Sequence, residues 1–142
     1  MRYLILLLVF LSLLDAQIYR KNSVHTVVDT TNQLMWVDNM SVIKIMKTHE
    51  DATSYCEELT HAGYTNWRIP ELEEFEYIVN KKNYKNYINY AFKYNVPDGY
   101  WARKSHWRTL WFYADYMHFV SGTPYFDSRH KKKYVRCVRD IK

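Results

Sequence analysis

Between two amphipathic segments of this chain lies the stretch Gly63-Tyr64-Thr65-Asn66-Trp67-Arg68-Ile69-Pro70. In the segment before it, Thr48 and Asp51 form a weak capping box, and Gly63 suits the position just beyond a helix end. We therefore predict a helix over residues 48–62. Its inward face consists of the apolar residues at helical spacing, namely Ala52, Tyr55, Cys56 and Leu59.

The segment after this stretch predicts a second helix. Pro70 favours the first helical position. The buried stripe of this helix consists of Leu72, Phe75, Ile78 and Val79. Glutamates stand at positions 71, 73, 74 and 76. Paired carboxylates can carry acid–base chemistry, but we interpret these as solvated side chains that complement the positive end of the helix dipole.

Most of the other regular segments indicate β-strands, so the predicted fold class is α+β. The turn residues Asp29-Thr30-Thr31-Asn32 separate two apolar runs, which predicts a β-hairpin over residues 24–37. Later aromatic and β-branched runs predict strands at 100–102, 110–114, 116–120 and 134–138. Turns are predicted at Ser121-Gly122-Thr123 and Asp127-Ser128-Arg129.

Residues 81–99 form the least regular part of the sequence. Tyrosines at positions 84, 87, 90 and 94 follow steps of three and four, which permits a short helix with one aromatic face. Pro97-Asp98-Gly99 ends this segment as a turn. We expect the tyrosines to pack against the body of the domain rather than to form a ligand platform.

The first residues predict export. An almost wholly apolar run from Leu4 to Leu14 follows the positive Arg2, and it is too short to span a bilayer. We expect a signal peptide over residues 1–16, then a single domain over residues 17–142 in the periplasm, at the cell surface or secreted. An uncleaved anchor is the alternative. We expect no stable membrane span after cleavage.

Two cysteines, Cys56 and Cys137, occur in the chain. Neither lies in a Cys-x-x-Cys arrangement, and their spacing suits no zinc site. In an exported chain they most simply form one disulfide, and a free reactive pair is the alternative. Such a bond stabilises the fold by roughly 4–5 kcal/mol in the chain-entropy model.

A set of short motifs spans the chain from about Val27 to Arg139. These motifs are Leu34-Met35-Trp36, Tyr55-Cys56, Gly63-Tyr64 with Trp67-Arg68 and Pro70, Tyr100-Trp101, Trp111 to Asp115, and Tyr134 to Arg139. In this order they resemble the Lcl C-terminal domain family, named after the Legionella collagen-like adhesin. The resemblance implies a C-type-lectin-like fold, in which two helices pack on a twisted antiparallel sheet with irregular loops. It also implies an extracellular binding role, and a disulfide from the first helix to the last strand.

The sequence departs from the family pattern at two places. Asn32-Gln33 replaces Thr-Gly before Leu34, and because Asn tolerates positive φ better than Gln we expect the turn to shift by one residue. Ala102-Arg103-Lys104 replaces small hydroxyl residues, so we expect no polar site built on those hydroxyls. The Glu-Pro-Asn and Gln-Pro-Asp triplets of calcium-dependent lectins are missing, so any sugar binding is expected to be calcium-independent.

No cluster of residues predicts an enzyme, a metal site or a cofactor. His49-Glu50 begins like a zinc-protease helix, but Thr53 stands where the second histidine belongs. The three glycines form neither a nucleophile elbow nor a phosphate loop. Lectin-like formylglycine-generating enzymes use closely placed cysteines on copper, whereas the two cysteines here are better explained as a bridge. We expect a non-enzymatic protein.

The chemical feature that stands out is basic, within a net charge of +5. One short loop carries Arg103, Lys104, His106 and Arg108 around Trp107, and the loop before the last strand carries Arg129, His130, Lys131, Lys132 and Lys133. In a lectin-like fold these two loops lie near one end. Arg and Lys can bind the anions of a sulfated polysaccharide while Trp107 stacks on a sugar ring. The alternative is a pair of solvated charge runs.

These observations favour an exported domain that binds acidic or sulfated glycans in adhesion, with an anionic polysaccharide as partner. The alternative is a structural or protein–protein interaction module of the bacterial cell envelope, in which exposed tyrosines contact an envelope or host surface protein. Basic loops with aromatic residues also permit nucleic-acid binding, but the predicted export argues against it.

Overall fold

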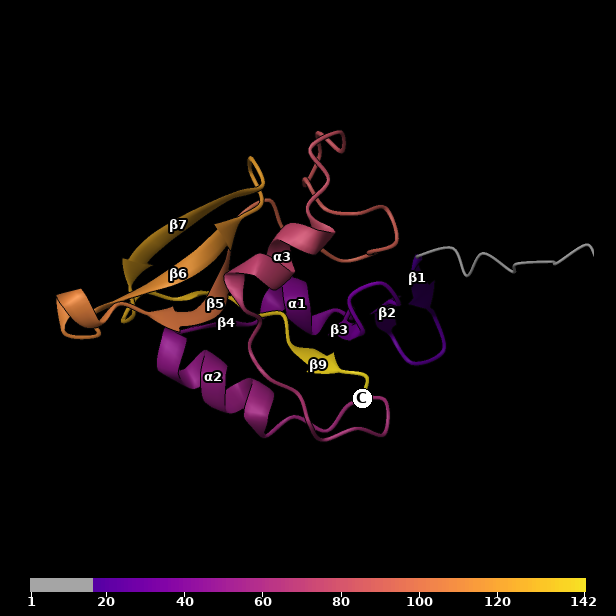
Figure 1. Ribbon diagram of the computed structural model, residues 1–142, viewed down its shortest axis with the longest axis horizontal. Coiled ribbons are helices and arrows are strands. Elements are labelled where there is room, and N and C mark those ends of the chain that lie inside the picture. Colours follow the sequence, from indigo (N-terminus) through magenta and orange to yellow (C-terminus); the bar gives the residue numbers. More distant parts are fainter. Residues whose placement is uncertain (1–16) are drawn as a thin grey trace, which may run out of the picture.

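The computed structural model describes residues 17–142, and the predicted signal peptide over residues 1–16 lies outside the described residues. In the described part the protein has an α+β fold with three α-helices and two β-sheets (Figure 1). The α+β class is confirmed. The prediction of two helices on a single antiparallel sheet was wrong in detail, because the strands divide into two separate sheets and a short additional helix forms.

The first sheet has the strand order β1-β2-β3-β9, and every neighbouring pair in it is antiparallel. Its strands are β1 (Ile18–Lys21), β2 (Thr26–Asp29), β3 (Leu34–Val37) and β9 (Val138–Asp140). The predicted hairpin is confirmed as β2 and β3, with Val27 opposite Trp36. The turn does not shift, since Gln33 itself takes the left-handed conformation with φ 56°. Its side-chain amide donates to the Thr30 carbonyl at 2.7 Å, which helps to hold this turn.

The second sheet has the order β4-β8-β5-β6-β7, and β5 and β8 pair in parallel. Its strands are β4 (Met46–Lys47), β8 (Lys133–Tyr134), β5 (Gly99–Ser105), β6 (Tyr113–His118) and β7 (Thr123–Ser128). The predicted strands 110–114 and 116–120 are in fact one strand, β6. The predicted turn at residues 127–129 was wrong for Asp127 and Ser128. Both belong to β7, in which Ser128 pairs with Tyr113.

The helices are α1 (Ser41–Lys44), α2 (His49–Glu57) and α3 (Leu72–Ile78). Helix α2 begins as predicted, with the Thr48 side chain accepting a hydrogen bond from the Asp51 amide. It ends five residues earlier than the predicted 62. The reason is tertiary, because the Trp67 indole donates to the carbonyls of His61 and Tyr64 and holds residues 61–64 in a separate turn.

Helix α3 begins at Leu72, two residues later than predicted from Pro70. Glu71 is its N-cap, and the Glu71 and Glu74 side chains form a reciprocal capping box with each other's backbone amides. Phe75 and Ile78 of its predicted stripe are fully buried. Two of the four glutamates therefore contribute to the helix start rather than serving only as solvated charges.

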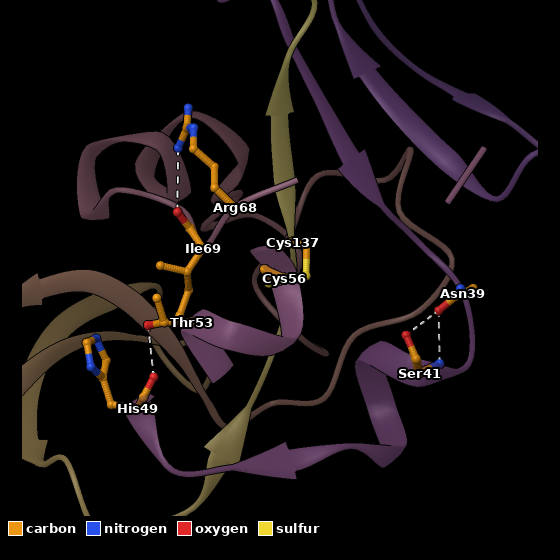
Figure 2. The surroundings of a disulfide bond; sticks show 8 residues. All are labelled: Asn39, Ser41, His49, Thr53, Cys56, Arg68, Ile69 and Cys137. Carbon is orange, nitrogen blue, oxygen red and sulfur yellow. Dashed lines mark hydrogen bonds between the residues drawn. A yellow bond between two sulfur atoms is a disulfide. The ribbon is translucent and has the colours of Figure 1, made fainter. Parts of the chain in front are cut away.

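The predicted disulfide between Cys56 and Cys137 is present and joins α2 to the chain just before β9 (Figure 2). The single last strand predicted over 134–138 was wrong, because its ends pair in different sheets, as β8 and β9, and Cys137 lies between them. Both cysteines are buried. Two motifs of the set also meet here, because the backbone amides and carbonyls of Arg68 and Val138 exchange hydrogen bonds of 2.8 and 2.9 Å. The C-terminal segment thus runs from β8 in the second sheet to β9 in the first, and the disulfide fixes its middle to α2.

Residues 80–98, here called the long loop, connect α3 to β5. The permitted helix over 81–99 does not form, and the segment folds as successive turns. Its anchor is Asp38, whose carboxylate accepts from the amides of Lys93 and Tyr94 and pairs with the buried guanidinium of Arg136. Arg136 in turn donates to the Tyr94 carbonyl. The long loop is therefore bound to both β3 and the C-terminal segment.

The expectation that the loop tyrosines pack against the body is confirmed for only two of the four tyrosines. Tyr87 and Tyr94 pack against the core. Tyr84 is 81% exposed, and Tyr90 is exposed as well. Ile88 and Phe92 are the loop's buried side chains. The loop therefore packs against the core mainly through these two residues and less through its tyrosines.

Candidate functional site

The connection from β5 to β6 forms a protruding element at residues 106–112, here called the tip. Its centre is a single turn of 3-10 helix, Trp107–Thr109, which Figure 1 places at the end of the molecule opposite β1. Thr109 closes the turn, because its hydroxyl donates to the His106 carbonyl at 2.8 Å and accepts from the Tyr113 amide. At the base, the His106 amide donates to the Tyr113 carbonyl. The tip is therefore held in shape by its own hydrogen bonds.

Four of the predicted binding residues come together at the tip. They line one open hollow of about 300 Å³ and are Lys104, His106, Trp107 and Arg108. Trp107 is 64% exposed, and the Arg108 guanidinium lies 5.6 Å from its ring centre. The hollow thus combines two cations with an accessible indole, which are groups that bind anions and stack on planar or sugar faces.

Two residues of this basic loop, His106 and Arg103, are held by carboxylates. The His106 imidazole lies 2.5 Å from the Asp115 carboxylate on β6, and its ring packs beside Phe126 on β7. This pair fixes the direction in which His106 faces the hollow. Arg103 lies outside the hollow lining and pairs with Glu71 at 3.1 Å, with both side chains solvated.

The second basic loop touches the tip through Arg129. Its amide donates to the Phe112 carbonyl at 2.9 Å and its guanidinium to the Trp111 carbonyl at 3.2 Å. The neighbouring His130 ring packs against Phe112. The two basic loops therefore meet, as expected, but Arg129 acts as a support for the tip and does not line the hollow.

The three lysines after His130 have different environments. Lys132 is exposed, whereas Lys131 and Lys133 both pair with Asp127, at 3.1 and 3.0 Å. Lys133 is only 13% exposed and lies 3.9 Å from the Tyr116 ring centre. Burial alone would raise the pKa of Asp127, but hydrogen bonds from Lys133, Ser128 and Lys131 lower it below its ordinary value. Lys133 therefore belongs to the packing of the second sheet.

Arg129 is in turn in contact with His49, which in the sequence stands out only as the start of an incomplete zinc motif. Its Nε2 is 2.9 Å from the Ala102 carbonyl, and its Nδ1 accepts from the Arg129 guanidinium at 3.2 Å. Burial lowers the pKa of His49, and the nearby Arg129 charge lowers it further. A neutral ring that carries its proton on Nε2 satisfies both contacts. No local pattern in the sequence could have predicted these contacts of His49, because Ala102 and Arg129 are far away along the chain.

The described residues contain no group of three or more His, Cys, Asp or Glu side chains arranged to hold a metal ion. Over residues 17–142, none of the helices has the length and apolar character to cross a membrane. What the tip offers chemically is therefore a small hollow that combines positive charge with an aromatic face.

Comparison with known proteins gives a family match. The family model described as the Lcl C-terminal domain matches residues 25–139. This range includes the tip, the long loop and both cysteines. Neither the comparison with curated proteins nor that with solved structures gave a match.

Proposed function

This chain belongs to the Lcl C-terminal domain family, an adhesin-associated domain, and from that premise we propose that it is an exported, non-enzymatic domain that binds acidic or sulfated glycans. The binding is calcium-independent and serves adhesion. The fold is C-type-lectin-like, a proposal supported by the bridge from α2 to the C-terminal segment and by the packing of helices on sheets. The apolar residues 4–14 and the disulfide both support export, because disulfides persist in oxidising compartments.

The observation that carries the glycan proposal is the hollow at the tip. Lys104 and Arg108 supply positive charge, and Trp107 supplies a flat apolar face within the same lining. A sulfated or uronic-acid-bearing sugar presents anions beside a partly apolar ring, so it complements both features. Lys132 lies on the neighbouring loop, where it adds attraction for a chain of repeated anions.

The test is retention on immobilised heparin, with elution followed over a salt gradient. Binding should weaken steeply between about 0.1 M and about 1 M salt, because the Debye length falls from about 10 Å to about 3 Å. The double variant Lys104→Ala/Arg108→Ala should bind roughly tenfold more weakly, since each lost cation removes a charge-assisted contact.

The matched control is Lys81→Ala/Lys82→Ala, which removes the same charge from two exposed lysines of the long loop. It should leave retention nearly unchanged. An equal loss in both double variants would reject the hollow as the site and leave only net charge as the cause. Retention that persists in Lys104→Ala/Arg108→Ala would also reject it.

A second function, a protein–protein module of the envelope, is favoured by one observation. Tyr84 and Tyr90 of the long loop are exposed and line a broad depression of about 530 Å³ with Lys82 and Lys85. Exposed tyrosines are common anchors of protein interfaces. A partner whose binding is insensitive to salt and is lost in Tyr84→Ala/Tyr90→Ala would support this function over glycan binding.

A further inference from the structure

The outer end of the tip is apolar and exposed. Leu110 is 88% exposed, Trp111 is 53% exposed, and Phe112 follows them with nearly half of its surface accessible. Phe126 on β7 lies close to this end, because its ring packs beside those of His106 and Tyr113. A run of large apolar side chains at one protruding end is unusual for a protein surface, where such residues are normally scattered singly.

The backbone at this end is strained in a way that the packing does not explain. Leu110 and Trp111 adopt consecutive left-handed conformations, with φ of 52° and 62°. Bulky side chains rarely take this conformation, and it persists where the surrounding structure imposes it. Because both side chains are mainly exposed, side-chain packing does not offset this strain, and the backbone is held by hydrogen bonds within the tip and from Arg129. The conformation instead directs two large apolar groups away from the protein.

The backbone donors at the outer end of the tip, from Thr109 to Phe112, are already satisfied. The amides of Thr109, Leu110 and Trp111 donate to the carbonyls of His106 and Trp107. The Phe112 amide donates to the Thr109 carbonyl, and the Tyr113 amide donates to the Thr109 hydroxyl. Five consecutive donors thus have partners within the tip. A segment that leaves water for an apolar phase needs this property, because an unsatisfied amide in such a phase is costly.

Positive charge adjoins the apolar end within its own segment, and Glu50 of α2 is a carboxylate that lines a hollow with Trp111 and Arg129. The sequence has no aspartate or glutamate from Gly99 to Ala114, while it places Lys104 and Arg108 beside the tip. Lys132 is exposed on the adjoining loop. Cations of this kind, next to exposed tryptophan and leucine, are complementary to a surface that is negatively charged outside and apolar below.

We propose that the tip docks into the interface of an anionic lipid bilayer. Leu110, Trp111 and Phe112 enter the boundary between headgroups and acyl chains, and Lys104, Arg108 and Lys132 contact lipid phosphates. The domain stays outside the bilayer and only its tip is immersed, as in peripheral proteins that lie on a membrane. This proposal does not rest on glycan binding, because Leu110, Trp111 and Phe112 do not line the hollow, and only the cations Lys104 and Arg108 are shared by the two proposals.

Two other occupants of the apolar end are outcomes of the test. A soluble protein partner offers polar groups that pair with free backbone donors, whereas the donors beside the apolar side chains, from Thr109 to Phe112, are already paired. A second copy of this chain would bring the same cations against each other, which disfavours contact between two tips. A bilayer with anionic headgroups matches both the apolar side chains and the charges around them.

The experiment measures co-sedimentation of the purified exported chain with two kinds of vesicles. One kind contains phosphatidylglycerol and phosphatidylcholine in equal parts, and the other contains phosphatidylcholine alone. The N-terminus of the sample is determined first by mass spectrometry, because residues 4–14 would themselves partition into lipid. The tip variant is Leu110→Ser/Trp111→Ser, and the matched control is Tyr84→Ser/Tyr90→Ser on the long loop.

The wild-type chain should associate with the anionic vesicles, and weakly with the neutral ones. The tip variant should lose roughly tenfold or more of that association, because burial of one large apolar side chain is worth at least a tenfold change in partitioning. Its heparin retention and melting temperature should stay unchanged, and the control should bind vesicles like the wild type. Tryptophan emission should shift to shorter wavelength with anionic vesicles in the wild type and in the control, but not in the tip variant, which lacks Trp111.

Three results would overturn the proposal: no association of the wild-type chain with anionic vesicles, an unchanged association of the tip variant, or a concentration-dependent dimer that the tip variant abolishes. Intact heparin retention in any of these cases would leave the proposed glycan binding standing. Conversely, lost heparin retention in Lys104→Ala/Arg108→Ala tests the hollow without removing the apolar end. The two proposals therefore fail separately.

Discussion

The long loop and the tip are similar in composition and opposite in construction. Both combine aromatic side chains with lysine or arginine, and both connect regular elements at the surface. The long loop buries Ile88 and Phe92 and is bound by Asp38 and Arg136 from other parts of the chain. The tip buries none of its own residues and is shaped mainly by hydrogen bonds within itself. The aromatic residues therefore serve mainly the fold in one loop and recognition in the other.

A shared backbone feature makes the difference plain. Tyr87 in the long loop and Leu110 in the tip both have φ 52°. Tyr87 packs against the core, so the packing offsets the cost of its conformation. Leu110 has no such compensation. A strained residue that points into solvent is a stronger indication of function than the same strain at a packed position.

The largest effect on stability is expected from removal of the Cys56–Cys137 disulfide, which closes a loop that contains both regions. Both loops lie between Cys56 and Cys137, which are 81 residues apart in sequence. In Cys56→Ala/Cys137→Ala the free energy of unfolding should fall by about 4 kcal/mol, because the unfolded chain regains the freedom that the closed loop removes. Urea unfolding with and without reductant measures this loss. A loss below about 1 kcal/mol would show that packing alone fixes the C-terminal segment.

The next largest effect concerns the carboxylates that hold the two regions, Asp38 for the long loop and Asp115 for the tip. Burial lowers the pKa of Arg136 to about 10, so this guanidinium remains charged at neutral pH and needs the Asp38 carboxylate. Asp38→Asn should therefore cost about 3–5 kcal/mol of unfolding free energy, as expected when one partner of a buried ion pair is removed.

The matched change at the tip is Asp115→Asn, which removes the carboxylate beside the half-exposed His106. It should cost about 1 kcal/mol or less, because solvent screens this pair. Thermal or urea unfolding of both variants gives the comparison. If the two substitutions cost the same, the distinction between an anchored loop and a self-supported tip is wrong.

The sequence predicted those parts of the fold that depend on neighbouring residues. The hairpin, the start of α2 and the Cys56–Cys137 pairing all follow from local patterns or from the small number of cysteines. The end of α2 was missed because Trp67 recruits the carbonyls of His61 and Tyr64 from a later turn. Strand β7 was not predicted, and it contains Pro124, which is tolerated because β7 lies at the sheet edge.

The same reasoning explains the site. Lys104, His106, Trp107 and Arg108 are close in sequence, so their shared hollow could be predicted. Lys133 was predicted as a ligand residue, but its packing depends on Tyr116 and Trp101, which reach it only through pairing of distant strands. Nor does the sequence reveal that Arg129 supports the tip, because its partner His49 is 80 residues away.

A smaller effect is the pH dependence of stability that His49, which contacts Arg129 below the tip, should cause. The pKa of His49 is lower in the folded protein than its ordinary value of about 6.5, so the unfolded chain binds more protons in the window below that value. Stability contributed by the neutral ring is therefore present above about pH 6.5 and is lost as the pH falls toward the folded pKa. Protonation also puts a positive charge beside the Arg129 guanidinium.

Unfolding in urea at about pH 7 and about pH 5 checks this expectation. The wild-type chain should lose more stability between these pH values than His49→Gln, whose side chain does not titrate. Parallel pH profiles for the two proteins would contradict the neutral His49 as a support.

The smallest effect is the sharpest test of the comparison, because it places the same new residue on the same backbone conformation in both loops. Asparagine tolerates positive φ better than Leu or Tyr. Leu110→Asn should leave the unfolding free energy within about 0.5 kcal/mol of the wild type, with a small gain expected, because it relieves strain and removes no packing. Tyr87→Asn relieves the same strain but loses contacts with the core, so it should destabilise by about 1–3 kcal/mol. If Leu110→Asn destabilises as much as Tyr87→Asn, then Leu110 is held by the fold, and its exposure is no longer an argument for a binding role.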